Sequence, residues 1–171
     1  MIIIGIDPGY HIGIAVFLNG KLTELRTLPN NDLAEFRDWF DSFIYDQVSW
    51  DTYHFVVECT HNDPARFRAS QDKSAYGIRR ADSTSSGIVE FIRGWRRGIN
   101  HYEMIEIHIH ELKPPRKGER LSKVRPAMFA QLFPEYNGRS SEHSRDAALH
   151  ARDWLIKEHL TQKEVGECFG E

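Results

Sequence analysis

The sequence predicts an α/β fold in which a five-stranded mixed sheet carries helices on both faces. The first observation is a run of three strand-like segments, joined by the turn-forming pairs Pro8-Gly9 and Asn19-Gly20, at 1–7, 12–18 and 21–28. Short turns of this kind link antiparallel neighbours, and Asn-Gly is a strong hairpin signal. The second observation is that each later strand-like segment follows a stretch of helical periodicity, which is typical of parallel strands joined by right-handed crossovers.

Helices and strands then alternate along the rest of the chain. Asp32 and Glu35 form a capping-box pattern, and apolar spacing carries the helix that follows to about Gln47. The remaining elements are expected as a strand at 53–59, a helix at 86–95, a strand at 103–109 and helices at about 121–132 and 142–160. The order β-β-β-α-β-α-β-α-α predicts an antiparallel meander that continues into parallel strands.

Length and composition favour one domain over residues 1–171. With 40% apolar and 12% aromatic side chains, the chain can bury a sizeable core. Cys59 and Cys168 are too few and too far apart for a disulfide framework, so both are expected as reduced thiols. The first residues contain neither a basic leader nor a long apolar run, so we expect a cytoplasmic protein with no membrane partner.

Charge is distributed unevenly along the sequence, although the formal net charge is only −3. Residues 24–51 are acidic and are interpreted as a solvated helix face, whereas 66–80, 93–97 and 113–125 are rich in Lys and Arg. Solvated surface is the alternative for any one basic stretch. The three together favour a track for a polyanion such as nucleic acid.

Two acidic residues stand at the ends of predicted strands, where α/β sheets bind ligands. Asp7 ends the first strand, although an Asp before Pro-Gly is also a favoured turn residue. Glu58 follows the buried run Phe55-Val56-Val57, where an ionised carboxylate needs a partner or a metal. In the last helix His143 and Asp146 share one face, and neighbouring alanines allow that helix to approach the sheet closely. We therefore expect three acids to converge.

Converging carboxylates repel one another and normally bind hard divalent cations. Two ions held about 4 Å apart activate a water molecule and stabilise the leaving oxygen in phosphodiester hydrolysis. That chemistry needs no nucleophilic side chain, and the sequence has no nucleophile elbow, Walker loop or HExxH motif. The acidic set therefore predicts a metal-dependent nuclease.

Three motifs in this order resemble the bacterial and phage RuvC-type Holliday junction resolvases over nearly the whole chain: Gly5-Ile6-Asp7-Pro8-Gly9 with Gly13, the strand-ending Glu58, and His143-Ser144-Arg145-Asp146-Ala147-Ala148. The resemblance implies a ribonuclease H-like fold. It also implies two Mg²⁺ ions per site, replaceable by Mn²⁺, held by Asp7, Glu58, His143 and Asp146. The implied activity is structure-selective cleavage of four-way junctions or related branched DNA in recombination and repair, in the cytoplasm of a bacterium or a phage-infected host.

The resemblance also suggests where DNA is contacted, because the family uses lysines before its last helix. Adding the basic stretches, the candidate DNA-binding residues are Lys113, Lys117, Lys123, Arg66, Arg68 and Lys73. Solvated surface remains the alternative for each. The chain departs from the family at Thr60-His61-Asn62, where the family has an aromatic that probes the substrate.

Histidine is an unusual ligand for Mg²⁺, so several roles stay open for His143. It could bind Mn²⁺, position the attacking water, or be a surface histidine, with Glu142 as the ligand in its place. His108 and His110 invite a zinc interpretation, which we reject because two further ligands are lacking.

Two other functions fit the same fold: an RNA-processing nuclease and a module that binds branched DNA without cutting it. An actin-like ATPase is disfavoured because it needs two such domains. Resolution of a junction requires two matched incisions, so we expect a homodimer. The resemblance puts its interface on the helix at 86–95, with candidates Ile88, Phe91, Ile92 and Trp95, and the alternative is that all four belong to the core.

Overall fold

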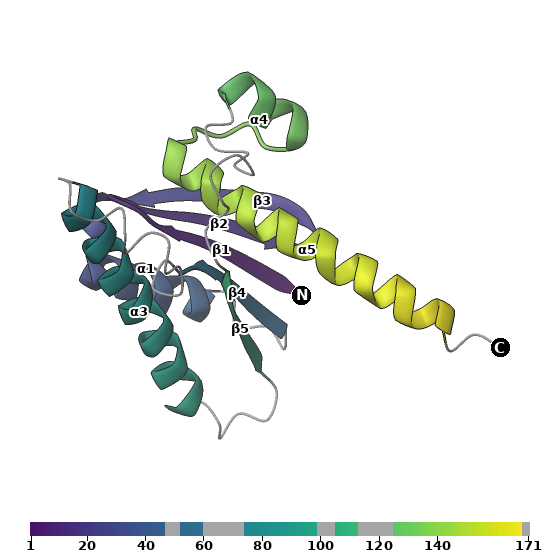
Figure 1. Cartoon of the computed structure of the whole chain (residues 1–171), viewed down its shortest axis with the longest axis horizontal. Helices are drawn as coiled ribbons and strands as arrows, with labels where there is room; N and C mark the ends of the chain where they lie inside the picture. Colours follow the sequence, from purple (N-terminus) through teal and green to yellow (C-terminus); the bar gives the residue numbers. More distant parts are fainter. Residues whose placement is uncertain (47–51, 60–73, 99–104, 113–124, 169–171) are drawn as a thin grey trace.

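A computed structural model of the chain describes residues 1–46, 52–59, 74–98, 105–112 and 125–168. A five-stranded sheet of order β3-β2-β1-β4-β5 runs through its centre (Figure 1). The strands are β1 (Ile2–Pro8), β2 (Ile12–Leu18), β3 (Lys21–Leu28), β4 (Thr52–Glu58) and β5 (Glu106–Leu112). β1 to β3 form an antiparallel meander, β4 is parallel to β1, and β5 is parallel to β4. Helices lie on both faces, so the predicted fold class is confirmed (Figure 1).

The Asn19-Gly20 turn joins β2 to β3 as the sequence predicts. Asn19 has φ 50° and Gly20 has φ 79°. Both values lie in the left-handed region that Asn and Gly tolerate best, and a two-residue hairpin turn with this geometry matches the twist of the strands.

On one face of the sheet, α1 (Leu33–Asp46) and α3 (Ser74–Gly98) cover the larger part of the core. The short 3-10 turn Pro29–Asn31 leads into α1. The side chain of Asp32 caps this helix, because its Oδ1 accepts a hydrogen bond from the backbone N–H of Ala34 at 2.8 Å. Aromatic side chains fill the layer beneath, including Phe36, Phe40 and Phe55.

On the opposite face, α5 (Glu142–Cys168) crosses the meander, and α4 (Pro126–Leu132) lies beside its amino-terminal end (Figure 1). Glycines allow the approach of α5. A Cβ on Gly5 would lie 2.2 Å from the backbone oxygen of Ala147, and one on Gly13 would lie 2.1 Å from that of His143. The helix backbone therefore rests directly on β1 and β2, which fixes the height of its side chains above the strand ends.

Two elements differ in extent from the sequence-based expectation. α3 begins at Ser74 rather than near Ser86. The apolar pattern does not extend to this earlier part, because the buried positions 84 and 85 are occupied by the polar residues Thr84 and Ser85. β5 spans Glu106–Leu112 rather than 103–109, since parallel pairing with β4 carries it to Leu112 opposite Glu58. The spacing of apolar residues in the sequence predicts neither the earlier start of α3 nor the bounds of β5. The helix expected at 121–132 is described only from Pro126, and α5 continues past residue 160.

The apolar residues of α3 serve the core of this chain. Ile88 and Ile92 are fully buried under the sheet. Phe91 and Trp95 are half-buried and pack edge-on against the ring of Phe40. Ile88 and Ile92 are therefore the candidates that face the sheet, and they cannot contribute to a dimer interface. Among the described residues, no helix is long and apolar enough to cross a membrane.

Candidate metal centre

The candidate site begins with two carboxylates at one edge of the sheet. Asp7 lies one residue before the end of β1 and is 8% exposed, and Glu58 is the last residue of β4. The two strands are parallel neighbours, with Ile6 opposite Val57. Their carboxyl ends consequently bring Asp7 and Glu58 to the same edge, as the sequence predicts.

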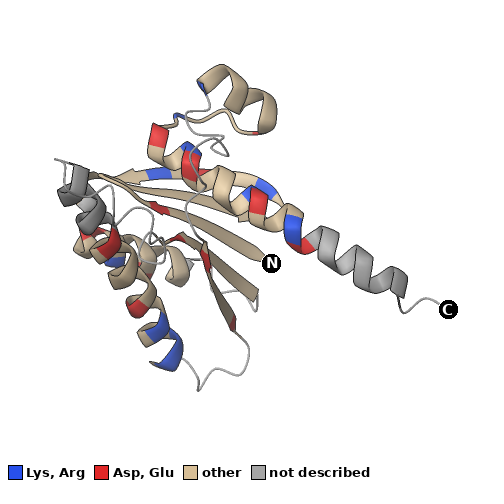
Figure 2. Cartoon of the chain, viewed as in Figure 1, with Lys and Arg blue, Asp and Glu red and all other residues tan. Residues whose placement is uncertain are grey.

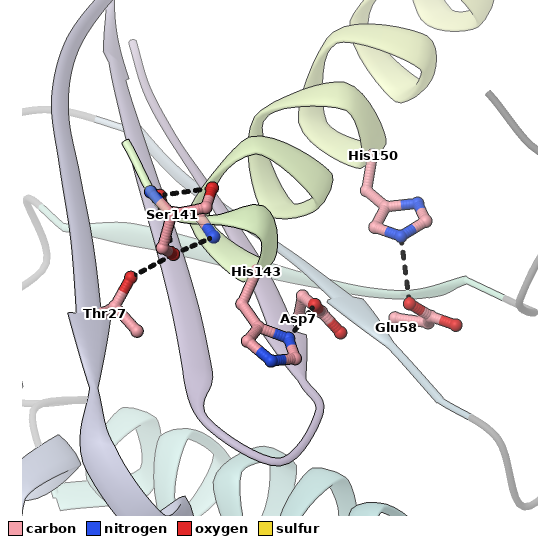
Figure 3. Close-up of polar contacts among 7 residues, drawn as sticks. Asp7, Thr27, Glu58, Ser141, His143 and His150 are labelled. Atoms are coloured by element: carbon pink, nitrogen blue, oxygen red, sulfur yellow. Dashed lines mark hydrogen bonds and ion pairs between the residues drawn. The ribbon is translucent and has the colours of Figure 1, made fainter. Parts of the chain in front are cut away.

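The amino-terminal half of α5 brings the remaining groups. His143, Asp146 and His150 recur at a spacing of three and four residues, so they share one face of the helix. The helix start is anchored by a reciprocal cap, in which Ser144 N–H donates to Ser141 Oγ at 3.1 Å and Ser141 N–H donates to Ser144 Oγ at 2.9 Å. The Ser141 hydroxyl also pairs with the Thr27 hydroxyl of β3 (Figure 3).

Each strand-end carboxylate is held by one histidine of α5. His143 Nδ1 lies 3.1 Å from Asp7 Oδ2, and His150 Nε2 lies 2.9 Å from Glu58 Oε2 (Figure 3). The predicted residues Asp7, Glu58, His143 and Asp146 therefore gather around one helix face. Sequence reasoning missed His150, although its position four residues after Asp146 on that face was a usable signal.

The electrostatics of the carboxylates follow from burial and from their proximity. Burial raises the pKa of Asp146 to about 6, with a further upward contribution from the charge of Asp7 and a smaller one from Glu58. Burial also raises the pKa of Asp7; the hydrogen bond from His143 opposes this rise, and the charge of Glu58 adds to it. The three acids thus lie within electrostatic reach of one another and disfavour full ionisation.

The two histidines respond in the opposite sense to the same charges. The hydrogen bond to Asp7 raises the pKa of His143, against a smaller opposing effect of desolvation. For His150, burial is the largest influence and lowers the pKa, yet the hydrogen bond to Glu58 together with the charges of Glu58, Asp7 and Asp146 leaves a net upward shift. Imidazolium character on α5 therefore compensates part of the negative charge.

The turn between β1 and β2 borders His143. A Cβ on Gly9 would lie 2.6 Å from the imidazole atoms of His143, so only glycine leaves room for that ring. The ring of His11 meets the ring of His143 edge-on at a centroid distance of 5.6 Å. His11 is itself oriented by the backbone N–H of Asn30, which donates to its Nδ1 at 3.1 Å. The imidazole of His143 is thus confined on two sides.

The donor set is chemically suited to a hard divalent cation, since three carboxylates supply oxygen ligands and their mutual repulsion is relieved by positive charge. Over the parts of the chain that the structure describes, no three His, Cys, Asp or Glu side chains already surround a common point. One oxygen of Asp7 contacts His143, and one oxygen of Glu58 contacts His150 (Figure 3). Asp7, Glu58 and Asp146 are the residues that would hold a cation.

The basic candidates are only partly placed. Lys113, Lys117, Lys123, Arg66, Arg68 and Lys73, and the segment Thr60-His61-Asn62, all lie outside the described residues. Arg96 and Arg97 are exposed in the last turn of α3 (Figure 2). That turn lies toward the amino end of β5, because a crossover helix returns the chain to the edge where the next parallel strand begins. Arg96 and Arg97 therefore lie away from the acidic edge, whereas Arg93 pairs with Glu111 near the carboxyl end of β5.

A second histidine cluster lies farther along the same sheet face. His54 of β4 and His108 and His110 of β5 stack with nearly parallel rings, and Trp154 of α5 covers His54 and His110. His54 Nδ1 lies 3.1 Å from His110 Nε2. Burial, and then the charge of His108, lowers the pKa of His54 to about 4, so the His54 ring packs as a neutral group. Sequence reasoning considered His108 and His110 but missed that cross-strand pairing adds His54.

The class of fold follows from the sheet and the helices. A five-stranded mixed sheet of this order with helices on both faces is a ribonuclease H-like fold. The sequence matches no protein-family model and no curated protein. Among solved structures, the chain is similar to T. thermophilus RuvC in complex with Holliday junction substrate. The likeness has 16% sequence identity and a TM-score of 0.51, and covers 94% of this chain and 96% of the other. At this identity the likeness establishes the fold.

Proposed function

We propose that the chain is a divalent-metal-dependent endonuclease that cuts four-way junctions or related branched DNA. The observation that carries the proposal is that Asp7, Glu58 and Asp146, from β1, β4 and α5, lie within electrostatic reach of one another at the carboxyl edge of the sheet. Three mutually repelling carboxylates destabilise the folded chain unless a cation is bound, so such a cluster is typical of a metal site. The similarity to a junction-bound structure supports branched DNA as the substrate.

Each site residue has a part in the proposed reaction. Mg²⁺ ions, with Mn²⁺ as a substitute, would activate a water molecule and stabilise the leaving oxygen when bound. Asp7, Glu58 and Asp146 supply the negative oxygens for them. His143, which contacts Asp7 through Nδ1, presents Nε2 as the group that can orient a water or exchange a proton with it. The glycine-lined contact between α5 and the sheet keeps these groups in fixed relation.

A homodimer completes the proposal, because one chain offers one acidic site and resolution requires two incisions. The candidate DNA contacts are Lys113, Lys117, Lys123, Arg66, Arg68 and Lys73. Cations at such positions bind phosphates with little dependence on sequence, so selectivity is expected to come from the shape of the branch.

The decisive experiment compares Mg²⁺-dependent cleavage of a four-way junction, a flap, a linear duplex and an RNA hairpin by the same preparation, with Asp7→Asn as the matched control. The proposal expects the junction to be cut by paired nicks and the duplex to be left intact. Preferred cleavage of the RNA hairpin would replace it with an RNA-processing role. Tight junction binding with cleavage equal to that of Asp7→Asn would leave a non-cleaving DNA-binding module.

A further inference from the structure

His150 and Glu58 form a shielded pair at the centre of the site. Nε2 of the imidazole lies 2.9 Å from Oε2 of the carboxylate, and the two side chains are 15% and 14% exposed. The corresponding pair of His143 and Asp7 is longer, at 3.1 Å, and its imidazole is 27% exposed. His150 is thus the more enclosed of the two histidines, and its contact with Glu58 is the shorter.

The side chain of Glu58 needs a contact from another element to fix the orientation of its carboxylate. This residue ends β4 directly after the buried Val56 and Val57 and before the buried Cys59. Its backbone is fixed by the ladder to β5, but a glutamate side chain retains several rotatable bonds beyond its Cα. A group from another element must select one orientation of the carboxylate. His150 comes from α5, whose backbone rests on Gly5 and Gly13 of the adjacent strands, and is therefore itself held in place.

Hydrogen bonding to one oxygen does not prevent a carboxylate from serving as a ligand. A carboxylate has two oxygens, so it can accept a hydrogen bond through one and bind a cation through the other. Outer groups that hold metal-binding carboxylates in this way typically change metal affinity by about 10- to 100-fold when removed. The tautomer follows from the geometry: Nε2 faces a carboxylate oxygen and must carry the hydrogen.

We propose that His150 is a positioning residue for the metal centre: its Nε2–H holds Oε2 of Glu58 and thereby aims the carboxylate toward the space shared with Asp7 and Asp146. This inference rests on the metal site of the proposed function. His150 is not a metal ligand in this role, and it touches neither DNA nor the attacking water. In this role it acts on the cation through Glu58.

The test measures Mn²⁺ binding by titration calorimetry on the full chain without DNA. His150→Ala should weaken binding by about 10- to 100-fold. The discriminating pair is His150→Gln and His150→Asn. The glutamine amide nitrogen lies as many bonds from Cβ as imidazole Nε2 and can restore the donor, whereas the asparagine amide lies near the place of Nδ1 and cannot. His150→Gln should bind Mn²⁺ within about threefold of the parent chain, and His150→Asn should resemble His150→Ala.

A double variant separates positioning from general loosening of the helix. In a Glu58→Gln background, replacing His150 by Ala should cause little further loss, because the two residues act through one carboxylate. If His150→Ala fails to fold, as judged by circular dichroism, the comparison of His150→Gln with His150→Asn still tests the positioning role. Both variants carry a polar amide at position 150 and differ only in how far it reaches.

The possible results keep the two proposals distinct. Equal Mn²⁺ affinity for the parent, Gln and Asn variants would overturn the positioning role and leave the nuclease proposal intact. Loss of affinity in Asn but not in Gln, with no cleavage of any nucleic acid by the parent chain, would support positioning and overturn the nuclease proposal. A parent chain that binds no Mn²⁺ would overturn both.

Discussion

His143 of α5 lies against Asp7 of β1, with Nδ1 3.1 Å from Oδ2, although the two residues are 136 positions apart in the sequence. The contact joins the last helix to the first strand at the edge where the carboxylates meet. It also supplies positive character beside the most buried of the three acids. The candidate metal centre is therefore assembled by the docking of α5, and changes that disturb this docking should disturb the candidate site.

Charge removal at the three acids should stop catalysis without unfolding the chain. We expect Asp7→Asn, Glu58→Gln and Asp146→Asn each to lower Mg²⁺-dependent junction cleavage by at least roughly 1000-fold, because several kcal/mol of charge stabilisation depend on the bound ions. Junction binding, measured by gel shift in Ca²⁺, should remain within a few-fold. Full activity in any of these variants would remove that residue from the proposed site.

Asp146 makes a prediction about pH and stability. Its pKa is raised from 3.8 to about 6, chiefly by burial, so the folded chain holds this proton more tightly than the unfolded chain. The stabilisation by the protonated Asp146 carboxyl group is fully present below the pKa that this group has in the unfolded chain. It is lost as the pH rises through about 6. Without metal, Asp146→Asn should therefore increase the free energy of unfolding by roughly 1 to 3 kcal/mol at about pH 8.

The same variant should bring no such gain at low pH, where the carboxyl group of the parent chain is protonated in both states. Urea unfolding with a chelator at about pH 8 and about pH 3 provides the comparison. A stabilisation by Asp146→Asn that is equal at both values would contradict the raised pKa.

Gly13 is expected to be the most sensitive glycine for helix docking. A Cβ here would lie 2.1 Å from the backbone oxygen of His143, so α5 must shift away from β2. We expect Gly13→Ala to cost about 2 kcal/mol or more, as overpacking against backbone does, and to weaken Mn²⁺ binding. The matched control is Gly94→Ala on α3, where a Cβ meets nothing within 4 Å. That change should be neutral or stabilising by up to about 1 kcal/mol. Equal unfolding midpoints for the two variants would argue against close docking.

Lys113 and Lys123 are predicted to contact phosphates rather than metal. Lys113→Ala and Lys123→Ala should weaken junction binding and reduce the slope of log affinity against log salt by about one for each lost contact. Titrations over a range of salt concentrations measure the slope, and Mn²⁺ affinity should not change. Slopes that match the parent chain would place both lysines away from the DNA.

Assembly can be measured directly by sedimentation. We expect a two-fold dimer of the 19.9 kDa chain when four-way junction DNA is bound. Ile88 and Ile92 are buried within one chain, so an interface on α3 must use its exposed positions instead. A 1:1 complex of monomer and junction at micromolar concentration would exclude the paired-incision mechanism.

Local patterns determined much of the fold and part of the site. Alternating apolar residues predicted the strands, Asn19-Gly20 predicted its hairpin, and Asp32 predicted the helix start, because each of these signals acts between residues close in the chain. Glu58 was identifiable as a candidate functional residue because a carboxylate directly after a buried strand needs compensation. His143 and Asp146 were predicted as its companions from their shared face of the last helix, and the family resemblance then implied their role as metal ligands.

Tertiary structure alone decided which groups touch. The pairing of His150 with Glu58 depends on how α5 crosses β4, and that crossing depends on backbone contacts at Gly5 and Gly13. The burial of the polar residues Thr84 and Ser85 in α3 depends on the packing of that helix against the sheet, and the row of His54, His108 and His110 depends on the register of β4 against β5. These outcomes share one physical reason: a sequence pattern gives the face on which a side chain lies, whereas its partner is set by the packing of elements remote in the chain.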